Sequence, residues 1–95
     1  FLAVLKLAGA ANDAPLGFMG PGHTLALDLP LTTGTVEFAH ELDALVLEFG
    51  GRCYLAKDST MAAARFRRMY PRLAEFLQYR DPGISSALSR RLMET

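Results

Sequence analysis

Residues 36–49 read VEFAHELDALVLEF and show the clearest periodic pattern of this 95-residue chain. Polar and charged residues fill one face of the helix that this spacing describes. Gly34 or Thr35 can cap its start, and Gly50 suits the left-handed position past its end. The sequence therefore predicts an amphipathic helix whose apolar side is Phe38, Ala39, Leu42, Leu45, Val46 and Phe49.

Short strands are predicted on both sides of this helix. Residues 1–7 are apolar on both alternating faces except at Lys6, a pattern that suits a buried strand ending at a polar site. Residues 24–29 read as a second strand and residues 52–56 as a third. Residues 9–22 hold Gly, Pro, Asn and Asp at turn frequency and predict a long loop. Because long loops inside compact domains are usually functional or disordered, this loop is a second place to look for chemistry.

Three more helices are predicted after the third strand. Ser59 or Thr60 can cap the first, Pro71 fits the first turn of the second, and residues 84–93 form a short terminal helix. The order of elements predicts an α+β fold, in which a small sheet of about three strands packs against the amphipathic helix and is followed by C-terminal helices. The side chains expected to point inward from the C-terminal helices are Ala62, Phe66, Met69, Leu73, Phe76 and Leu77.

The apolar content of the chain is 51%, slightly above the about 45–50% of an ordinary soluble domain. The excess either faces a missing partner or further chain, or belongs to an apolar-rich monomer, and composition leaves both open. Because the chain opens inside an apolar strand pattern and without Met, we expect it to be a piece of a longer protein. The opening run is shorter than the ~20 residues of a membrane span and lacks the basic start of a signal peptide.

Charge is divided unevenly along the chain although the net charge is zero. Residues 1–50 hold one Lys or Arg and six Asp or Glu, whereas residues 51–95 hold nine and four. The basic half could bind phosphates, but the sequence shows no recognition helix and no aromatic platform for a nucleic acid. A solvated or domain-docking helix face is the preferred interpretation of Arg65, Arg67, Arg68, Arg72, Arg90 and Arg91.

The reactive side chains form no self-contained catalytic set, and no metal site is predicted. His40 lies on the polar face of the predicted helix, where we expect it to be solvated, far in sequence from His23. Cys53 has alternating apolar neighbours and reads as a buried small hydrophobe. A single cysteine excludes an internal disulfide framework, and makes a reducing cytoplasm the default compartment, with peripheral attachment to a membrane left open.

Lys57 and Lys6 differ from the arginines because each stands alone at the end of an apolar segment. Lys57 belongs to the run Tyr54-Leu55-Ala56-Lys57-Asp58. A cation in this position either extends to solvent or is aimed at an electron-rich group. On general grounds the solvent-facing lysine is the commoner of the two.

Short pieces spread over nearly the whole chain match one family in order and spacing. They are Phe1-Leu2 through Lys6, Asn12, Ala14-Pro15-Leu16, Phe18, Pro21-Gly22, Asp28 with Pro30, Leu42-Asp43, Glu48 through Arg52, Tyr54 through Ser59, Met69-Tyr70-Pro71-Arg72, Asp81-Pro82 and Arg90-Arg91-Leu92. Together they resemble the C-terminal end of the flavin-dependent sugar oxidoreductases of the vanillyl-alcohol-oxidase fold, in particular the decaprenylphosphoryl-ribose oxidase type.

This resemblance implies a fragment of a larger two-domain flavoprotein. Residues 1–51 would be the end of a substrate-binding domain, and residues 52–95 would be the stretch that returns to the flavin-binding domain. The change of charge sign near residue 51 fits that division. FAD would be bound mainly by the N-terminal domain of the same protein, which this chain lacks, so we expect the isolated segment to be inactive.

The resemblance also implies roles for five residues. Lys57 matches a lysine beside the flavin, which would stabilise the negative charge of the reduced ring and hold the substrate hydroxyl. Tyr54 matches a tyrosine that lines the same site, so both are candidates for catalysis and for cofactor binding. Lys6, Asn12 and Thr24 correspond to positions on the substrate side and are the candidates for substrate binding.

The predicted function is therefore that of the C-terminal part of a flavin-dependent oxidoreductase. It would transfer a hydride from a CH–OH group of a sugar or polyol, possibly lipid-linked, to FAD. His23 and Ala8 stand where the family usually has aromatic residues, which leaves the substrate open. The alternative is a stand-alone α+β interaction module that binds an acidic partner through its basic C-terminal half; neither nucleic-acid binding nor a transmembrane segment is expected.

Overall fold

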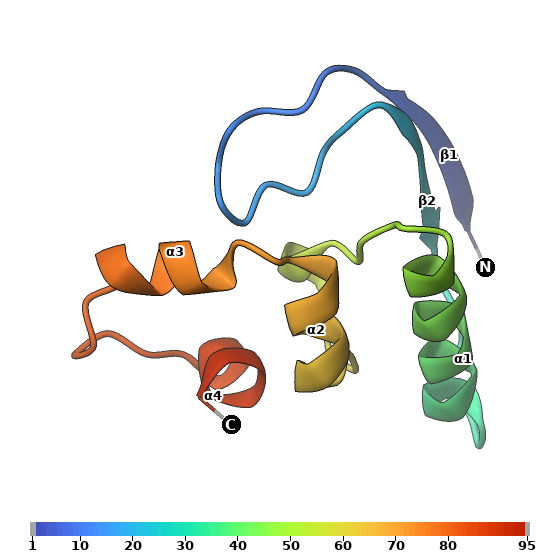
Figure 1. The fold of residues 1–95 in the computed structure, drawn as a ribbon. Coiled ribbons are helices and arrows are strands. Elements are labelled where there is room, and N and C mark those ends of the chain that lie inside the picture. The colour runs from blue at the N-terminus through green and yellow to red at the C-terminus, as the bar shows by residue number, and fades with distance from the viewer. Residues whose placement is uncertain (1, 95) are drawn as a thin grey trace.

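The computed structural model describes residues 2–94 and begins with an antiparallel hairpin. Its strands are β1, Ala3–Ala8, and β2, Gly22–Leu27, joined by the predicted long loop. Four α-helices follow within the described residues, so the predicted α+β class is confirmed (Figure 1). Phe1, where the first strand was predicted to begin, lies outside the described residues.

The third strand predicted at residues 52–56 is wrong, and the sheet has two strands within the described part of the chain. The side chains there do alternate, because Cys53 is half-buried whereas Arg52 and Tyr54 are exposed. No strand pairs with this segment; the carbonyl of Cys53 instead accepts a hydrogen bond of 2.6 Å from the hydroxyl of Tyr70. The chain then closes into a 3₁₀ turn, η1, at Leu55–Lys57.

The amphipathic helix forms as predicted and is α1, Thr35–Glu48. Gly34 precedes it with φ 90° and Gly50 follows it with φ 76°. Both values lie in the left-handed region, which residues with a Cβ rarely adopt, so glycine suits both ends of the helix.

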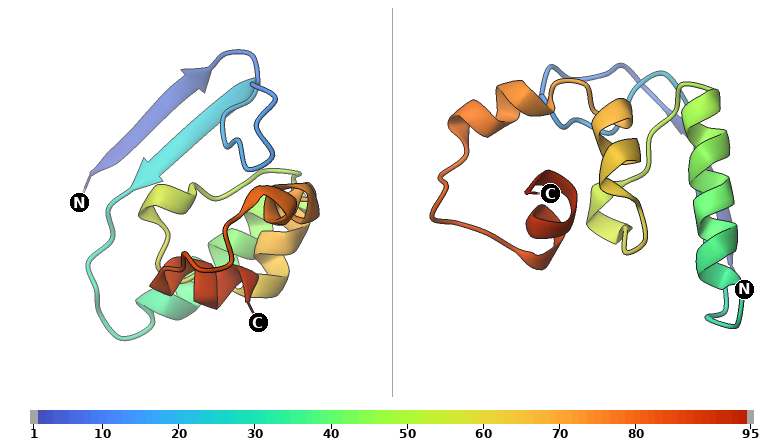
Figure 2. Two further views of the ribbon diagram at one scale, coloured as in Figure 1. Left: turned by 90° about the vertical axis from the view of Figure 1, so that its left-hand side faces the viewer. Right: turned by 60° about the horizontal axis from the view of Figure 1, so that its bottom comes forward.

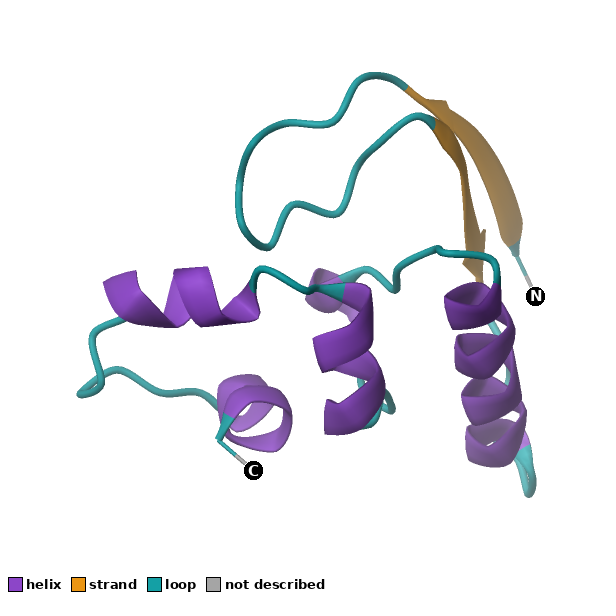
Figure 3. Ribbon diagram, viewed as in Figure 1, coloured by secondary structure: helices purple, strands orange, loops and turns teal. Residues whose placement is uncertain are grey.

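The C-terminal helices are shorter than the sequence predicts. They are α2, Ala63–Met69, α3, Leu73–Tyr79, and α4, Ala87–Met93 (Figure 3). Pro71 lies before α3 rather than in its first turn, because the N-cap of that helix is Arg72.

The predicted cap of α2 is also wrong. Neither Ser59 nor Thr60 caps this helix, whose N-cap is Ala62 without a side-chain hydrogen bond. The hydrogen bonds before the helix come from Asp58 instead. Its Oδ1 accepts from the backbone N–H groups of Thr60, at 3.1 Å, and Met61, at 2.9 Å. Asp58 therefore fixes the turn that leads from η1 to α2.

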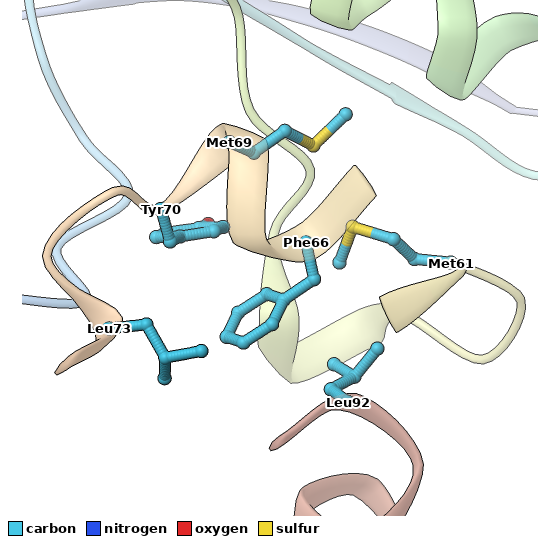
Figure 4. Close-up of a cluster of buried hydrophobic side chains, with 6 residues drawn as sticks. All are labelled: Met61, Phe66, Met69, Tyr70, Leu73 and Leu92. Carbon is cyan, nitrogen blue, oxygen red and sulfur yellow. The ribbon is translucent and has the colours of Figure 1, made fainter. Parts of the chain in front are cut away.

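The hydrophobic core lies among the C-terminal helices and the segment that enters them. Figure 4 shows its buried members gathered around α2, with the side chain from α4 closing one side. Full burial of one such side chain stabilises a fold by roughly 1.5–3 kcal/mol. The buried apolar residues are Met61, Phe66, Met69, Tyr70, Leu73 and Leu92. The inward positions predicted for Phe66, Met69 and Leu73 are confirmed, whereas those predicted for Ala62 and Leu77 are wrong, because both residues are exposed.

The hairpin and α1 contribute no fully buried residue to this core, although Val46 and Leu47 of α1 pack against its edge. No residue of α1 is fully buried, and Phe49 just past its end is 80% exposed. In the hairpin, Leu5 is 66% exposed and Leu25, its partner across the strands, is 58% exposed. Figure 2 shows the hairpin standing to one side of the helices. The apolar excess of the composition thus faces outward in this chain, and a two-stranded hairpin of this kind is marginally stable by itself.

Candidate active site

Tyr54 and Lys57 lie at the two ends of one tight turn. The backbone N–H of Lys57 donates a hydrogen bond of 3.3 Å to the carbonyl of Tyr54, which closes η1. Both side chains are exposed, Tyr54 to 50%. One turn therefore carries both a phenol and an ammonium that are exposed at the surface of the chain.

Buried groups flank this turn on both sides. Before it, Cys53 Sγ donates a hydrogen bond of 3.2 Å to Asp43 Oδ1 of α1, and its carbonyl accepts from Tyr70 as described above. After it, the side chain of Asp58 is only 7% exposed and forms an ion pair with Arg91 of α4. The backbone of the turn is thus anchored to α1, α2 and α4, while its two predicted catalytic side chains stay free of the core.

The surroundings of Cys53 and Tyr70 keep both of these groups protonated at neutral pH. Burial, the hydrogen bond with Asp43 and the charges of Asp43 and Asp58 raise the pKa of the Cys53 thiol to about 12. Burial likewise raises the pKa of the Tyr70 hydroxyl to about 12. Both therefore act as hydrogen-bond donors, and Cys53, predicted to be a buried small hydrophobe, is a half-buried donor instead.

The long loop between β1 and β2 folds back over this region (Figure 1). Arg52 Nη1 donates a hydrogen bond of 2.6 Å to the carbonyl of Gly17, and Arg72 Nη1 donates one of 3.1 Å to the carbonyl of Asp13. The ring of Phe18 lies against Tyr54, with 5.1 Å between the ring centroids. Two arginines and one aromatic contact therefore hold the loop beside the Tyr54–Lys57 turn.

Asn12 shapes the loop from within. Its Oδ1 accepts a hydrogen bond of 2.9 Å from the N–H of Ala14. A Cβ at Gly17 would lie 2.7 Å from the same oxygen, so glycine is needed for this close approach. One acceptor of Asn12 is thus used in the loop itself.

Lys6 and Thr24 lie directly opposite one another across the hairpin. Because side chains alternate along a strand, both lie on one face of the sheet. Thr24 and Asn12 line a cavity of about 330 Å³ between the loop and the Gly50–Arg52 segment, whereas Lys6 is not among its lining residues.

The five predicted site residues therefore form two neighbouring groups. Tyr54 and Lys57 share the turn, and Asn12 and Thr24 share the cavity, with Lys6 beside Thr24 on the hairpin. Phe18 joins the two groups, since it lines the cavity and contacts Tyr54.

The sequence interpretation missed the arginines that organise this site. Arg72, Arg65 and Arg91 were assigned to a solvated or docking face, but all three make internal hydrogen bonds. Guanidinium groups offer several donors in a fixed geometry and reach backbone carbonyls that are distant in sequence. Arg52 and Arg72 lie in two pieces that carry the family resemblance, Glu48 through Arg52 and Met69 through Arg72. This was the only sign in the sequence that these arginines have a role within the fold.

His40 also differs from its prediction. Its ring is half-buried, and Nε2 lies 2.9 Å from the carbonyl oxygen of Thr60. Arg65 Nη1 donates a hydrogen bond of 2.6 Å to the carbonyl of His40. The residue thus belongs to the contact between α1 and α2 rather than to a solvated face.

The exposed donors at the turn fit the edge of an electron-rich ring. Lys57 offers a positive charge with three N–H donors, Tyr54 offers a hydroxyl, and Phe18 adds an apolar surface. Such a set can bind an anionic or electron-rich group at the surface of the chain. None of the helices in residues 2–94 is long and apolar enough to cross a membrane.

No family model matches the chain. It is 48% identical to decaprenylphosphoryl-beta-D-ribose oxidase of Mycolicibacterium smegmatis in an alignment 97 positions long, which covers 97% of this chain and 21% of that protein. It is 38% identical, over 94% of its length, to an uncharacterized protein in the mprA 5'region of Streptomyces coelicolor, of which it spans 26%. This partial span is consistent with the expected segment of a larger protein. The similarity confirms the resemblance to the decaprenylphosphoryl-ribose oxidase type, and nearly the whole chain is related in sequence to a segment of such an oxidase.

Proposed function

We propose that this chain is the C-terminal segment of an FAD-dependent oxidoreductase that oxidises a CH–OH group of a sugar or polyol. The observation that supports this best is the 48% identity to decaprenylphosphoryl-beta-D-ribose oxidase over nearly the whole chain. The name of that relative suggests a ribose joined to a lipid through phosphate, and we propose a substrate of that class.

The roles proposed for Lys57 and Tyr54 follow from their place on the turn. FAD, when bound, accepts the hydride and carries negative charge once reduced. The ammonium of Lys57 would stabilise that charge and donate a hydrogen bond to the substrate hydroxyl. The hydroxyl of Tyr54 would hold the same substrate oxygen, while the contact between its ring and Phe18 limits its motion.

The substrate is proposed to lie along the cavity and the hairpin. Thr24 offers a hydroxyl at the cavity wall, and Asn12 offers the amide N–H₂ that its loop hydrogen bond leaves over. Lys6, beside Thr24, would bring a positive charge toward a phosphorylated sugar.

Residues 1–51 and 52–95 are proposed to belong to the substrate-binding and flavin-binding domains of the larger protein. All the buried apolar residues named above lie between Met61 and Leu92, whereas the hairpin and α1 contain none. This distribution fits a second segment that holds the core, against which the first segment packs only through partly buried side chains such as Val46 and Leu47. The isolated chain would lack most of the FAD site and would be inactive.

The alternative, an interaction module with a basic docking face, has less support. Arg65, Arg72 and Arg91 bind carbonyls or carboxylates within the chain. Fewer of the cations of the C-terminal half are therefore available to an acidic partner.

The test uses the protein encoded by the complete reading frame around this chain. After purification it should contain FAD by absorbance and mass spectrometry, and decaprenylphosphoryl-beta-D-ribose should bleach the flavin absorbance without oxygen. Ribose 5-phosphate, which lacks the lipid, should reduce the flavin more slowly if the substrate is lipid-linked. A protein that holds no flavin, or a flavin that no sugar or polyol reduces, would contradict the proposal.

A further inference from the structure

Asp58 is an unusually well-bonded carboxylate for a residue that adjoins an exposed lysine. Its side chain is 7% exposed. Oδ1 accepts from the N–H groups of Thr60 and Met61, and Oδ2 pairs with Arg91. Both oxygens are therefore occupied by groups other than Lys57.

Arg91 reaches this site from the far end of the chain. Its Nη1 donates a hydrogen bond of 2.6 Å to the carbonyl of Ser59, in addition to the ion pair of Nη2 with Asp58. The next residue, Leu92, is fully buried in the core and fixes α4 against α2. The guanidinium thus belongs to a packed helix and binds Asp58 and Ser59, the two residues that directly follow Lys57.

This arrangement has an electrostatic consequence for Lys57. A free carboxylate at the adjoining position would pair with the ammonium and neutralise it. Asp58 is bonded to Arg91 and to two backbone N–H groups, and Lys57 makes no ion pair among the described residues. Its charge stays available to an anionic or electron-rich group outside the chain.

We propose that Asp58 and Arg91 are positioning residues for Lys57: the pair fixes the backbone that follows Lys57 and keeps the neighbouring carboxylate away from its ammonium. The inference rests on the proposed function, in which Lys57 contacts the reduced cofactor and the substrate. It assigns to α4, the last helix, a part in orienting a side chain on the distant turn η1.

The test is a double-mutant cycle in the flavin-loaded full-length protein. Asp58→Asn keeps the size of the side chain and an acceptor oxygen but removes the ion pair, and Arg91→Ala removes the other partner. Arg91→Ala, which leaves the Asp58 carboxylate without its ion pair, should lower the limiting rate of flavin reduction by roughly 10- to 100-fold, since a small misplacement of a reacting group has effects of this size. Asp58→Asn, which removes the ion pair together with the competing carboxylate, should lower it less. In a Lys57→Ala background the same changes should have little further effect, because they act through Lys57.

A second readout is independent of activity. Hydrogen exchange at the amides of Thr60 and Met61 should speed up in Asp58→Ala, which removes the acceptor oxygen, and in Arg91→Ala, with or without bound flavin. Glu94→Gln is the matched control, because it changes a carboxylate to an amide in the other α4 ion pair, Arg80–Glu94, at 2.5 Å. It should leave both the rate and these amides unchanged.

The outcomes separate the two claims. Losses that are as large in the Lys57→Ala background as in the wild type would overturn the positioning role, as would unchanged exchange at Thr60 and Met61. If Lys57→Ala alone leaves flavin reduction unchanged, the role proposed for Lys57 falls, and the positioning inference falls with it. A protein without flavin would count against the proposed function while the exchange measurement still tests the Asp58–Arg91 pair.

Discussion

At the scale of single residues, the site depends on contacts that join distant parts of the sequence. Lys57 and Tyr54 could be proposed as site residues from the sequence, because the motif around them is contiguous and matches a family. The ion pair between Asp58 and Arg91 could not, since 33 positions separate the two residues and nothing local specifies the pairing. Arg52 was seen in a matching piece, but its hydrogen bond to the loop depends on the folded chain.

Cys53 gives a prediction at this scale. At pH 8 its alkylation by iodoacetamide should be about 10³-fold slower in the folded chain than in denaturant, because a thiol pKa of about 12 instead of 9.0 depletes the reactive thiolate. Asp43→Asn should speed the reaction in the folded chain, since both the hydrogen bond and the charge of Asp43 raise the pKa. Equal rates in the folded and denatured chains would show that Cys53 lies in no such environment.

At the scale of elements, periodicity predicted the existence of the helices better than it predicted backbone pairing or the side chains that are covered. The alternation around Cys53 is present, yet the segment has no partner strand and ends in a 3₁₀ turn. The helical spacing of residues 36–49 correctly gave α1, but Phe38 and Leu45 on its apolar side remain about half exposed. A pattern of this kind states that a face is apolar, and the surrounding chain decides whether that face is covered.

The capping box of α4 leads to a prediction for this element. Ser86 Oγ accepts a hydrogen bond of 3.1 Å from the N–H of Ser89, and Ser89 Oγ accepts one of 2.8 Å from the N–H of Ser86. Ser86→Ala should lower the free energy of opening α4 by about 1 kcal/mol, measured by hydrogen exchange at Arg90, whose N–H bonds the carbonyl of Ser86.

Ser59→Ala is the control for this measurement, because its hydroxyl makes none of the hydrogen bonds that cap α4. If Ser86→Ala and Ser59→Ala change the exchange of the α4 amides equally, the capping box does not stabilise the helix.

At the scale of the whole molecule, the chain has a buried core on one side and uncovered apolar surface on the other. The hairpin exposes Leu5, Leu7 and Leu25, and α1 exposes Phe38 and Leu45. The sequence could indicate an apolar excess from composition, but only the structure shows that the hairpin and α1 present it. Uncovered surface of this kind, with open strand edges, favours association.

The isolated chain should therefore self-associate or bind a hydrophobic dye. Analytical ultracentrifugation across a range of protein concentrations would detect the association, and dye fluorescence would report the exposed surface. Leu5→Lys with Leu25→Glu, a pair directly opposite in the hairpin, should reduce both signals. A clean monomer with no dye signal would instead favour an autonomous module.

The most direct test of the central claim is the rate of flavin reduction in the full-length protein when Lys57 is changed. Lys57→Ala should lower this rate by ~10²–10³-fold in stopped-flow experiments, as expected when one preorganised charge is removed, while the melting temperature stays unchanged. Lys57→Arg should restore little, because a planar guanidinium does not replace a compact ammonium, and Tyr54→Phe should cost less than Lys57→Ala. If Lys57→Ala reduces flavin at nearly the wild-type rate, Lys57 is a solvent-facing lysine at the end of a turn, and the catalytic role assigned to it is wrong.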